Sequence, residues 1–240
     1  MIKYLILLIS ISTTLSAQVT LPTYQGIQYP DYQPPIPNGS VFCQSANNVA
    51  TYVLDVTSTT GKIWMDRNLG ATRAATSSTD ANAYGDLYQW GRFTDGHQCR
   101  TSSTTSTLSS TDVPGNALFI LSGRDWRSPQ NANLWQGVNG TNNPCPSGYR
   151  LPTSAEWDAE RLSWSSNNAV GAFASPLKLP VTGIRKYTDG EIFINSVGFY
   201  WSSTVIFTDS FNLRFSDSSA DATIDFSSPS YGLSVRCIKN

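Results

Sequence analysis

The side chains that could perform catalysis are few in this chain. Its single histidine, His97, excludes most zinc, iron and histidine-base chemistry. Glu156 and Glu160 stand four residues apart and could share one helix face as a carboxylate pair, although Glu156 is better explained as a helix cap. The sequence contains no nucleophile elbow and no phosphate-binding loop. These residue types predict a protein without enzymatic activity.

Residues that could bind a ligand gather near the C-terminus. Alternation along the segments 211–215 and 222–226 puts apolar side chains on one face of a sheet and polar side chains on the other. The predicted apolar set is Phe211, Leu213, Phe215, Ile224 and Phe226. The candidate binding residues are the polar set, the acids of the adjoining loops and a neighbouring tryptophan: Asp209, Asn212, Arg214, Asp217, Asp221, Thr223, Asp225 and Trp201.

This candidate set offers a charge-assisted donor, several acceptors and small hydroxyls on one surface. An ordinary solvated sheet face is the alternative interpretation. Trp201 is expected in the core, with a stacking platform as the alternative. The aspartates at 209, 217, 221 and 225 could hold a calcium ion, although loop carboxylates are usually just solvated. No other cofactor is predicted.

Short strands and turns must position these residues. Segments 199–205, 211–215, 222–226 and 233–238 predict four strands of one antiparallel sheet. Upstream, 51–57 and 61–71 predict a hairpin. The spacing of the aromatic and apolar residues within 79–92 predicts a helix that begins at Asp80 and ends at Gly91.

The segment CPSGYRLPTSAEWDAE, residues 145–160, is interpreted as scaffold. A Pro/Gly turn leads into a strand at 149–151, and Thr153 with Glu156 forms a capping box at the start of a helix. The predicted buried side of that helix consists of Ala155, Trp157, Ala159, Leu162 and Trp164. The low-complexity stretch 100–112 predicts a mobile surface loop, and the irregular region that follows it, with Trp126 and Trp135, predicts a packed functional loop.

Composition and the N-terminus indicate an exported protein. The net charge is -1 and only 14% of residues are charged, so no global field attracts nucleic acid or an anionic membrane. Lys3, a short apolar run and Ala17 predict a signal peptide at 1–17, followed by a Pro/Tyr-rich linker at 18–41 and one domain at 42–240. The predicted location is secreted, extracellular or on the cell surface. In such an oxidising compartment, four cysteines indicate two disulfides, with three connectivities open.

Five motifs in order resemble one known family. IWMDRNLGA, YGDLYQWGR, PCPSGYRLPTSAEW, FYWSST and SVRC, spread over about residues 50–240, resemble the Fibrobacter succinogenes major paralogous domain of exported Bacteroidetes and phage proteins. At longer range, YRLPTSAEWDAE and the terminal VRC resemble the formylglycine-generating-enzyme branch of C-type-lectin-like folds. The resemblance implies an α+β domain with two short helices, a small antiparallel sheet, long irregular loops and chain ends that lie close together. It also implies a disulfide between Cys145 and Cys237, with Cys43 and Cys99 as the second pair.

The resemblance does not extend to the residues that make its relatives active. Formylglycine-generating enzymes use a cysteine pair for copper near the C-terminal end of the domain, where this chain has only Cys237, and sulfoxide-synthase relatives use three histidines. Calcium-dependent lectins use Glu-Pro-Asn or Gln-Pro-Asp and Trp-Asn-Asp motifs, which are absent. The prediction is therefore a non-catalytic recognition module that binds a glycan or a surface protein. The alternatives are a structural surface protein without a discrete ligand, a phage-encoded adhesion protein and, least favoured, an oxidoreductase of the formylglycine-generating kind.

Overall fold

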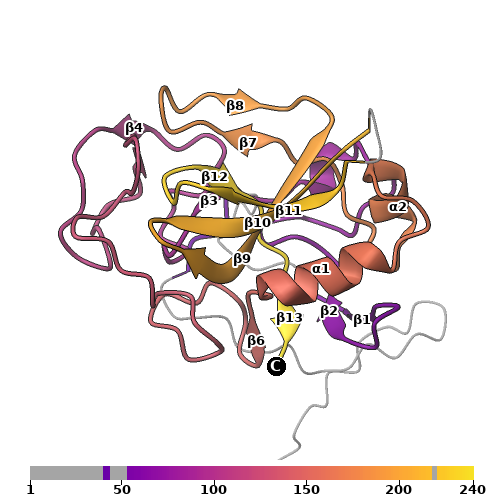
Figure 1. Ribbon diagram of the computed structural model, residues 1–240. Helices are drawn as coiled ribbons and strands as arrows, with labels where there is room; N and C mark the ends of the chain where they lie inside the picture. The colour runs from indigo at the N-terminus through magenta and orange to yellow at the C-terminus, as the bar shows by residue number, and fades with distance from the viewer. Residues whose placement is uncertain (1–39, 44–52, 218–220) are drawn as a thin grey trace, which may run out of the picture. The chain divides into compact units, whose positions relative to one another are not determined.

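The computed structural model describes residues 40–43, 53–217 and 221–240 (Figure 1). The predicted signal peptide at 1–17, and the predicted linker up to residue 39, lie outside the described residues. Within the linker's last two positions, Ser40 is buried and the backbone N–H of Val41 donates to the carbonyl of Thr94 at 2.9 Å. These two residues are therefore packed against the domain.

Strands from the two ends of the domain share one sheet. β1 (Asp55–Thr57) and β2 (Ile63–Met65) form the predicted hairpin, and β13 (Ile238–Lys239) pairs antiparallel with both β2 and β6 (Tyr149–Arg150). The strand order is β1-β2-β13-β6. The start and the end of the domain are thus neighbours, as the resemblance implies.

The predicted C-terminal sheet has three strands. β9 (Val197–Ile206), β10 (Asp209–Ser216) and β11 (Thr223–Ser227) are antiparallel in the order β11-β10-β9. The prediction of a fourth strand at 233–238 is wrong, because the two ends of this segment belong to two different sheets. β12 (Gly232–Leu233) joins β3 (Tyr88–Gln89), β7 (Ile184–Arg185) and β8 (Ile192–Phe193) in the order β3-β12-β7-β8, whereas residues 238–239 form β13. Buried Arg236 lies between β12 and β13 in the chain. Its guanidinium donates to the carbonyls of Met65 and Leu177, which fixes the path of the chain from one sheet to the other.

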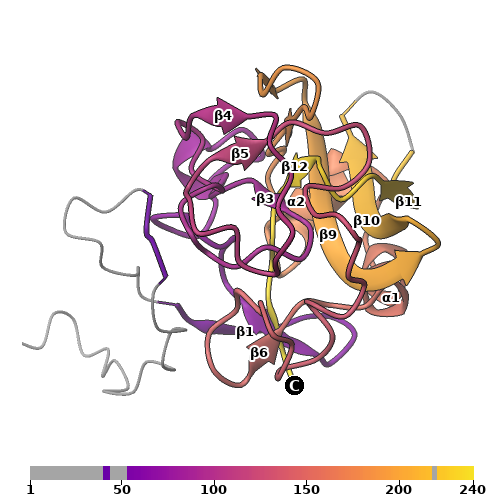
Figure 2. The ribbon, with the colours of Figure 1, turned by 90° about the vertical axis from the view of Figure 1, so that its left-hand side faces the viewer.

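Two helices cover one face of the β11-β10-β9 sheet. α1 (Ser154–Leu162) contacts all three strands, and α2 (Ala169–Ala174) contacts β10 (Figures 1 and 2). A core cluster that includes Trp157, Tyr200 and Leu213 fills this side. Trp201 points to the opposite face, as successive strand residues must, and belongs to a second cluster that includes Leu233. The sheet is therefore buried on both faces near β9. The domain is α+β, as predicted.

A bulge in β9 explains the segment YWSST. Ser210 is paired with Val205 but Asn212 is paired with Trp201, so residues 202–204 stand opposite a single residue of β10. The bulged backbone and hydroxyls bind other elements. The Ser202 carbonyl accepts from the Trp90 indole at 2.9 Å, and Thr204 Oγ1 accepts from the first N–H of α1 at 3.0 Å.

The predicted upstream helix is wrong. Within 79–92 only Ala81–Ala83 is helical, as a short 3₁₀ helix, although Asp80 does cap it. The chain then turns at Gly85, which has a φ of 68°, and enters β3. Both residues of β3 are buried, so this segment packs in the core as a strand and not as a helix. The stretch 100–112 lies mostly at the surface, as predicted. It contains β4 (Thr104–Thr105), which pairs in parallel with β5 (Phe119–Ile120) (Figure 2).

The capping box of α1 is confirmed, but its buried side is not the predicted one. Thr153 Oγ1 accepts from the Glu156 N–H at 3.2 Å, and Glu156 accepts from the Thr153 N–H at 2.8 Å. The helix buries Trp157 and Glu160, whereas Leu162 is 68% exposed. The prediction failed because it placed only apolar residues on the buried side. Glu160 points inward and accepts from the Trp164 indole at 3.3 Å.

Thr153→Ala is expected to lower the free energy of unfolding by about 1 kcal/mol, because the first turn of α1 loses its hydroxyl acceptor. Ser154→Ala is the matched control. Its interaction with Thr204 uses the backbone N–H, which alanine keeps. Urea unfolding of the two variants would measure the difference, and equal values would contradict the capping role.

Candidate functional site

Cross-strand pairing brings four of the predicted binding residues together. Asn212 lies opposite Asp225 and Arg214 opposite Thr223. With Ser210 opposite Ser227, these pairs form three rungs on one face of the β10–β11 pair, here named the polar ladder. Leu213 and Ile224 are paired on the other face, towards the core. The predicted alternation is confirmed in these strands, except that Phe226 is 56% exposed because it lies near the strand end.

The β10 members of the inner rungs of the polar ladder are closed to a ligand. Ser210 and Asn212 are both 0% exposed, and Asn212 donates to Ser227 Oγ at 3.1 Å. Trp201 is also 0% exposed and its indole donates to the carbonyl of Tyr88 at 2.7 Å. Asn212 is therefore wrongly predicted as a surface residue, because the second core cluster covers this side of the sheet, whereas Trp201 lies in the core as expected and forms no stacking platform. The accessible part of the ladder is its outer edge at Arg214, Thr223 and Asp225.

The predicted loop aspartates do not converge. Asp209 begins β10 and Asp217 follows its last residue, so about 26 Å of strand separates them. Asp221 accepts from the Ser216 N–H at 3.1 Å and lies 3.6 Å from the Arg214 guanidinium, which indicates a brace for the end of β10. Among residues 40–43, 53–217 and 221–240, no three side chains of a metal-binding type come together. These four aspartates therefore do not form the calcium site that was considered from the sequence.

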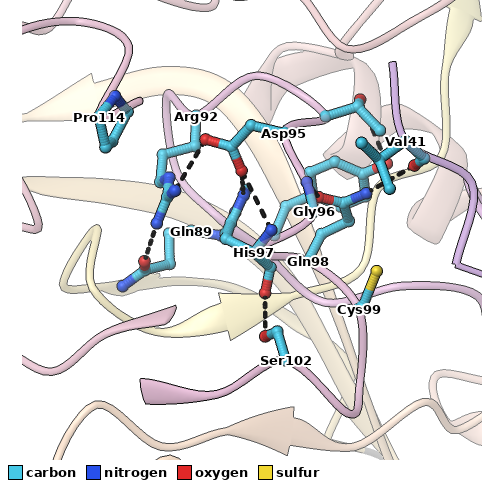
Figure 3. Close-up of polar contacts among 12 residues, drawn as sticks. Val41, Gln89, Arg92, Asp95, Gly96, His97, Gln98, Cys99, Ser102 and Pro114 are labelled. Atoms are coloured by element: carbon cyan, nitrogen blue, oxygen red, sulfur yellow. Dashed lines mark hydrogen bonds and ion pairs between the residues drawn. The ribbon is translucent and has the colours of Figure 1, made fainter. Parts of the chain in front are cut away.

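The only histidine is enclosed in a polar network (Figure 3). His97 is 0% exposed, and its Nε2 accepts from the Gln89 N–H at 3.1 Å. The ring proton is therefore on Nδ1, which donates to Asp95 at 2.6 Å. Ser102 donates its hydroxyl to the His97 carbonyl, not to the ring. An Asp–His–Ser set is present by composition, but both ring nitrogens are occupied, so the histidine cannot take a proton from the serine.

The charges around His97 belong to the same network. Arg92, also 0% exposed, donates to Asp95 at 2.7 Å and to Gln89 at 3.0 Å. Burial would raise the pKa of Asp95, but the charges and hydrogen bonds of His97 and Arg92 lower it to about 2. Burial and the charge of Arg92 lower the pKa of His97 to about 4. The network ties the loop 92–102 to β3 and is interpreted as scaffold.

The His97 ring is expected to stay neutral throughout the neutral range. Because its folded pKa lies below its ordinary value of 6.5, protonation opposes folding, and the histidine costs stability as the pH falls from about 6.5 to about 4. NMR of the ring nitrogens should show the Nδ1–H tautomer with constant shifts from pH 8 to pH 5.5. A titration midpoint near 6.5 would contradict the enclosed network.

The other predicted functional residues are structural. Glu156 binds Arg150 at 2.7 Å in addition to capping α1, and buried Glu160 faces the core, so the two carboxylates do not act as a pair. Trp126 and Trp135, which are 1% and 0% exposed, donate to backbone carbonyls. The aromatic residues of this irregular region thus brace the loops, and no aromatic platform lies there.

The most exposed large apolar side chain of the described residues was missed from the sequence. Phe207 is 94% exposed and lies in the two-residue turn between β9 and β10. Its backbone has a φ of 52°, a left-handed conformation that glycine or asparagine normally supplies in such turns. The signal that could have found it is an aromatic residue in a turn position between two predicted strands.

The turn that carries Phe207 is held in place from outside the hairpin. Arg124 Nη1 donates to Thr208 Oγ1 at 3.2 Å, and Gln130 Nε2 donates to the Thr208 carbonyl at 3.0 Å. Ser228, just after β11, donates its hydroxyl to the carbonyl of Arg124. We call these residues, Phe207, Thr208, Arg124, Gln130 and Ser228, the tip surface.

Both disulfides join the predicted pairs. Cys43 is bonded to Cys99 and Cys145 to Cys237, with Cα–Cα distances of 5.2 and 5.9 Å. Neither described helix is long and apolar enough to cross a membrane. Comparison with models of protein families, with curated proteins and with solved structures finds no match to this chain. The resemblance to the Fibrobacter succinogenes major paralogous domain therefore stays a prediction.

Proposed function

We propose that this protein is an exported, non-catalytic recognition module with a C-type-lectin-like arrangement. It binds a glycan or a protein at a cell surface or in the extracellular matrix. The two disulfides and the α+β class support this proposal, and so does the enclosure of the one histidine. The binding region would be the outer edge of the β11-β10-β9 sheet and the turn between β9 and β10.

The conformation and exposure of Phe207 carry the proposal. A left-handed backbone costs a non-glycine residue about 1–2 kcal/mol, and an exposed ring gains nothing from burial in the fold. A residue that opposes the local backbone preference without stabilising the domain points to function. The hydrogen bonds to Thr208 hold the turn that carries Phe207, which lowers the backbone entropy lost on binding.

The outer edge of the polar ladder is a separate contact region. Arg214 and Asp225 offer a donor and an acceptor there, but Arg214 lies seven residues from Phe207, about 23 Å along a strand. A small ligand cannot reach both regions. Each region therefore needs its own variant.

The test is a glycan-array and cell-binding screen with the full chain. We expect Phe207→Gly to abolish capture while its folding free energy stays within about 1 kcal/mol of wild type, because glycine suits the turn. Arg214→Ala with Asp225→Ala tests the ladder edge. Val170→Ala is the control, since Val170 is 65% exposed on α2.

The outcomes separate the candidate regions. If Phe207→Gly loses binding, the site lies at the tip surface. If only the double variant loses binding, the site lies at the ladder edge. Binding that survives both variants contradicts the proposed region. A chain that captures nothing in either screen would instead agree with a structural surface protein.

A further inference from the structure

We infer that the ligand of the tip surface is a folded protein with an apolar pocket that encloses Phe207 and an acceptor group at its rim for Arg124. This inference rests on the proposed function and names the class of partner. Three features of the tip surface support it: its projecting shape, its fixed polar rim and its unpaired positive charge.

The shape of the site favours an enclosing partner. Phe207 is the first of two residues that turn between strands, so it stands at a convex end of the sheet, and 94% of its surface is open. A sugar ring would cover one face of such a side chain and leave its edge and other face in water. A concave pocket removes most of the apolar surface from water, which is the larger gain.

The rim is ready for such a partner. Thr208 is the other turn residue, and its hydroxyl and carbonyl are each held by a side chain from the segment 124–130. Ser228 ties that segment to the end of β11. An apolar anchor within a fixed polar rim is the usual anatomy of a strong contact between proteins.

The charge of the rim indicates what the partner presents. Within the part of the chain that the structure describes, Arg124 is exposed and has no ion pair, whereas neighbouring Arg127 is paired with Asp112 at 2.8 Å. The Arg124 guanidinium donates one bond to Thr208 and keeps further N–H groups for a carboxylate or a carbonyl of the partner. Asp209, beside the tip, disfavours a strongly acidic partner.

The first step of the test uses the full chain with p-benzoyl-phenylalanine at position 207. The control carries the same group at position 170 on α2. Both proteins are applied to the intact cells that bind wild type and then irradiated. We expect one protein to be crosslinked from position 207 and not from 170, and mass spectrometry identifies it.

The second step measures the pairwise Kd with that purified protein. Phe207→Gly should weaken binding about 30-fold or more, as expected for a buried aromatic anchor. Phe207→Leu should keep part of the affinity, Arg124→Ala should lose a few-fold mainly in the association rate, and Val170→Ala should change nothing. An affinity that is equal for wild type and Phe207→Gly overturns the inference.

A glycan result also overturns it. If Phe207→Gly abolishes binding to a defined glycan on the array and position 207 yields no protein crosslink, the recognition function stands and the protein partner is wrong. If neither screen depends on Phe207, the proposed function at the tip surface fails as well.

Discussion

Replacing both Cys145 and Cys237 by alanine is expected to lower the free energy of unfolding by at least about 4.5 kcal/mol. The bridge closes a loop of 92 residues, and loop-closure entropy alone accounts for that amount. Both cysteines also lie in the second core cluster, at 1% and 0% exposure, so removal of the sulfur atoms leaves a cavity that costs more. Small domains have a total stability of about 5–15 kcal/mol, so a large share of it would be lost.

The second disulfide is the matched control. Cys43–Cys99 closes a loop of 56 residues, which corresponds to about 4 kcal/mol in the same model. Its cysteines are only partly buried. The two deletions should therefore differ by more than loop length explains, with the larger loss for Cys145–Cys237. Guanidinium unfolding of both double variants measures this. A larger loss for Cys43–Cys99 would show that the core packing of the first bridge adds nothing.

Local signals in the sequence predicted the elements whose form depends on neighbouring residues. Thr153 and Glu156 satisfy each other within one turn, so the start of α1 could be predicted. Alternation likewise predicted which residues of β10 face the core, because Leu213 has apolar partners on that side. These patterns hold because the deciding contacts are short in sequence or repeat with the strand.

Elements that depend on distant partners could not be predicted. The aromatic spacing in 79–92 fits a helix, but Tyr88 pairs with Leu233 in a sheet whose other strand arrives late in the chain. Arg236 divides the last predicted strand, because its guanidinium is fixed by oxygen atoms on two distant segments of the chain, at 65–68 and at 177. A single apolar period cannot encode such a contact.

The candidate site shows the same division. Alternation correctly placed Arg214, Thr223 and Asp225 on one face. Burial of that face depends on the second core cluster, so the core position of Trp201 was expected but the enclosure of Asn212 was not predictable. Phe207 was overlooked because composition suggests function in polar loops. Its significance depends on the backbone conformation and on the exposure, which the sequence does not state.

A buried acid should make the domain less stable as the pH rises from about 4 to about 7. Asp86 is 1% exposed, its Oδ1 has no hydrogen-bond partner among the described residues, and its carboxyl packs against the backbone of Gly70, where a Cβ would lie 2.2 Å from Oδ2. Burial raises the pKa of Asp86 to about 7, and the positive charge of Arg100 only partly opposes this. In the unfolded chain the same group has a pKa near 3.8.

The sign and size of the effect follow from these two pKa values. Between pH 4 and pH 7 the folded state keeps a proton that the unfolded chain releases, so stability is highest at the acid end and falls as the pH rises. The difference between the pKa values corresponds to about 4 kcal/mol. Asp86→Asn keeps the shape without the charge. Relative to wild type, it should gain about 4 kcal/mol of stability between pH 4 and pH 8.

Only the difference between the two proteins tests this prediction. Asp125 is half-buried and burial raises its pKa to about 6, so it gives wild type and variant the same additional loss of stability. Urea unfolding of both proteins at several pH values would show the difference, and Asp217→Asn at an exposed position supplies the control. Parallel stability curves for wild type and Asp86→Asn would mean that Asp86 is ionised in the fold at neutral pH. In that case the positive charge of Arg100 must lower the pKa of Asp86 by at least as much as burial raises it. The Nη1 of Arg100 is buried without a hydrogen bond among the described residues.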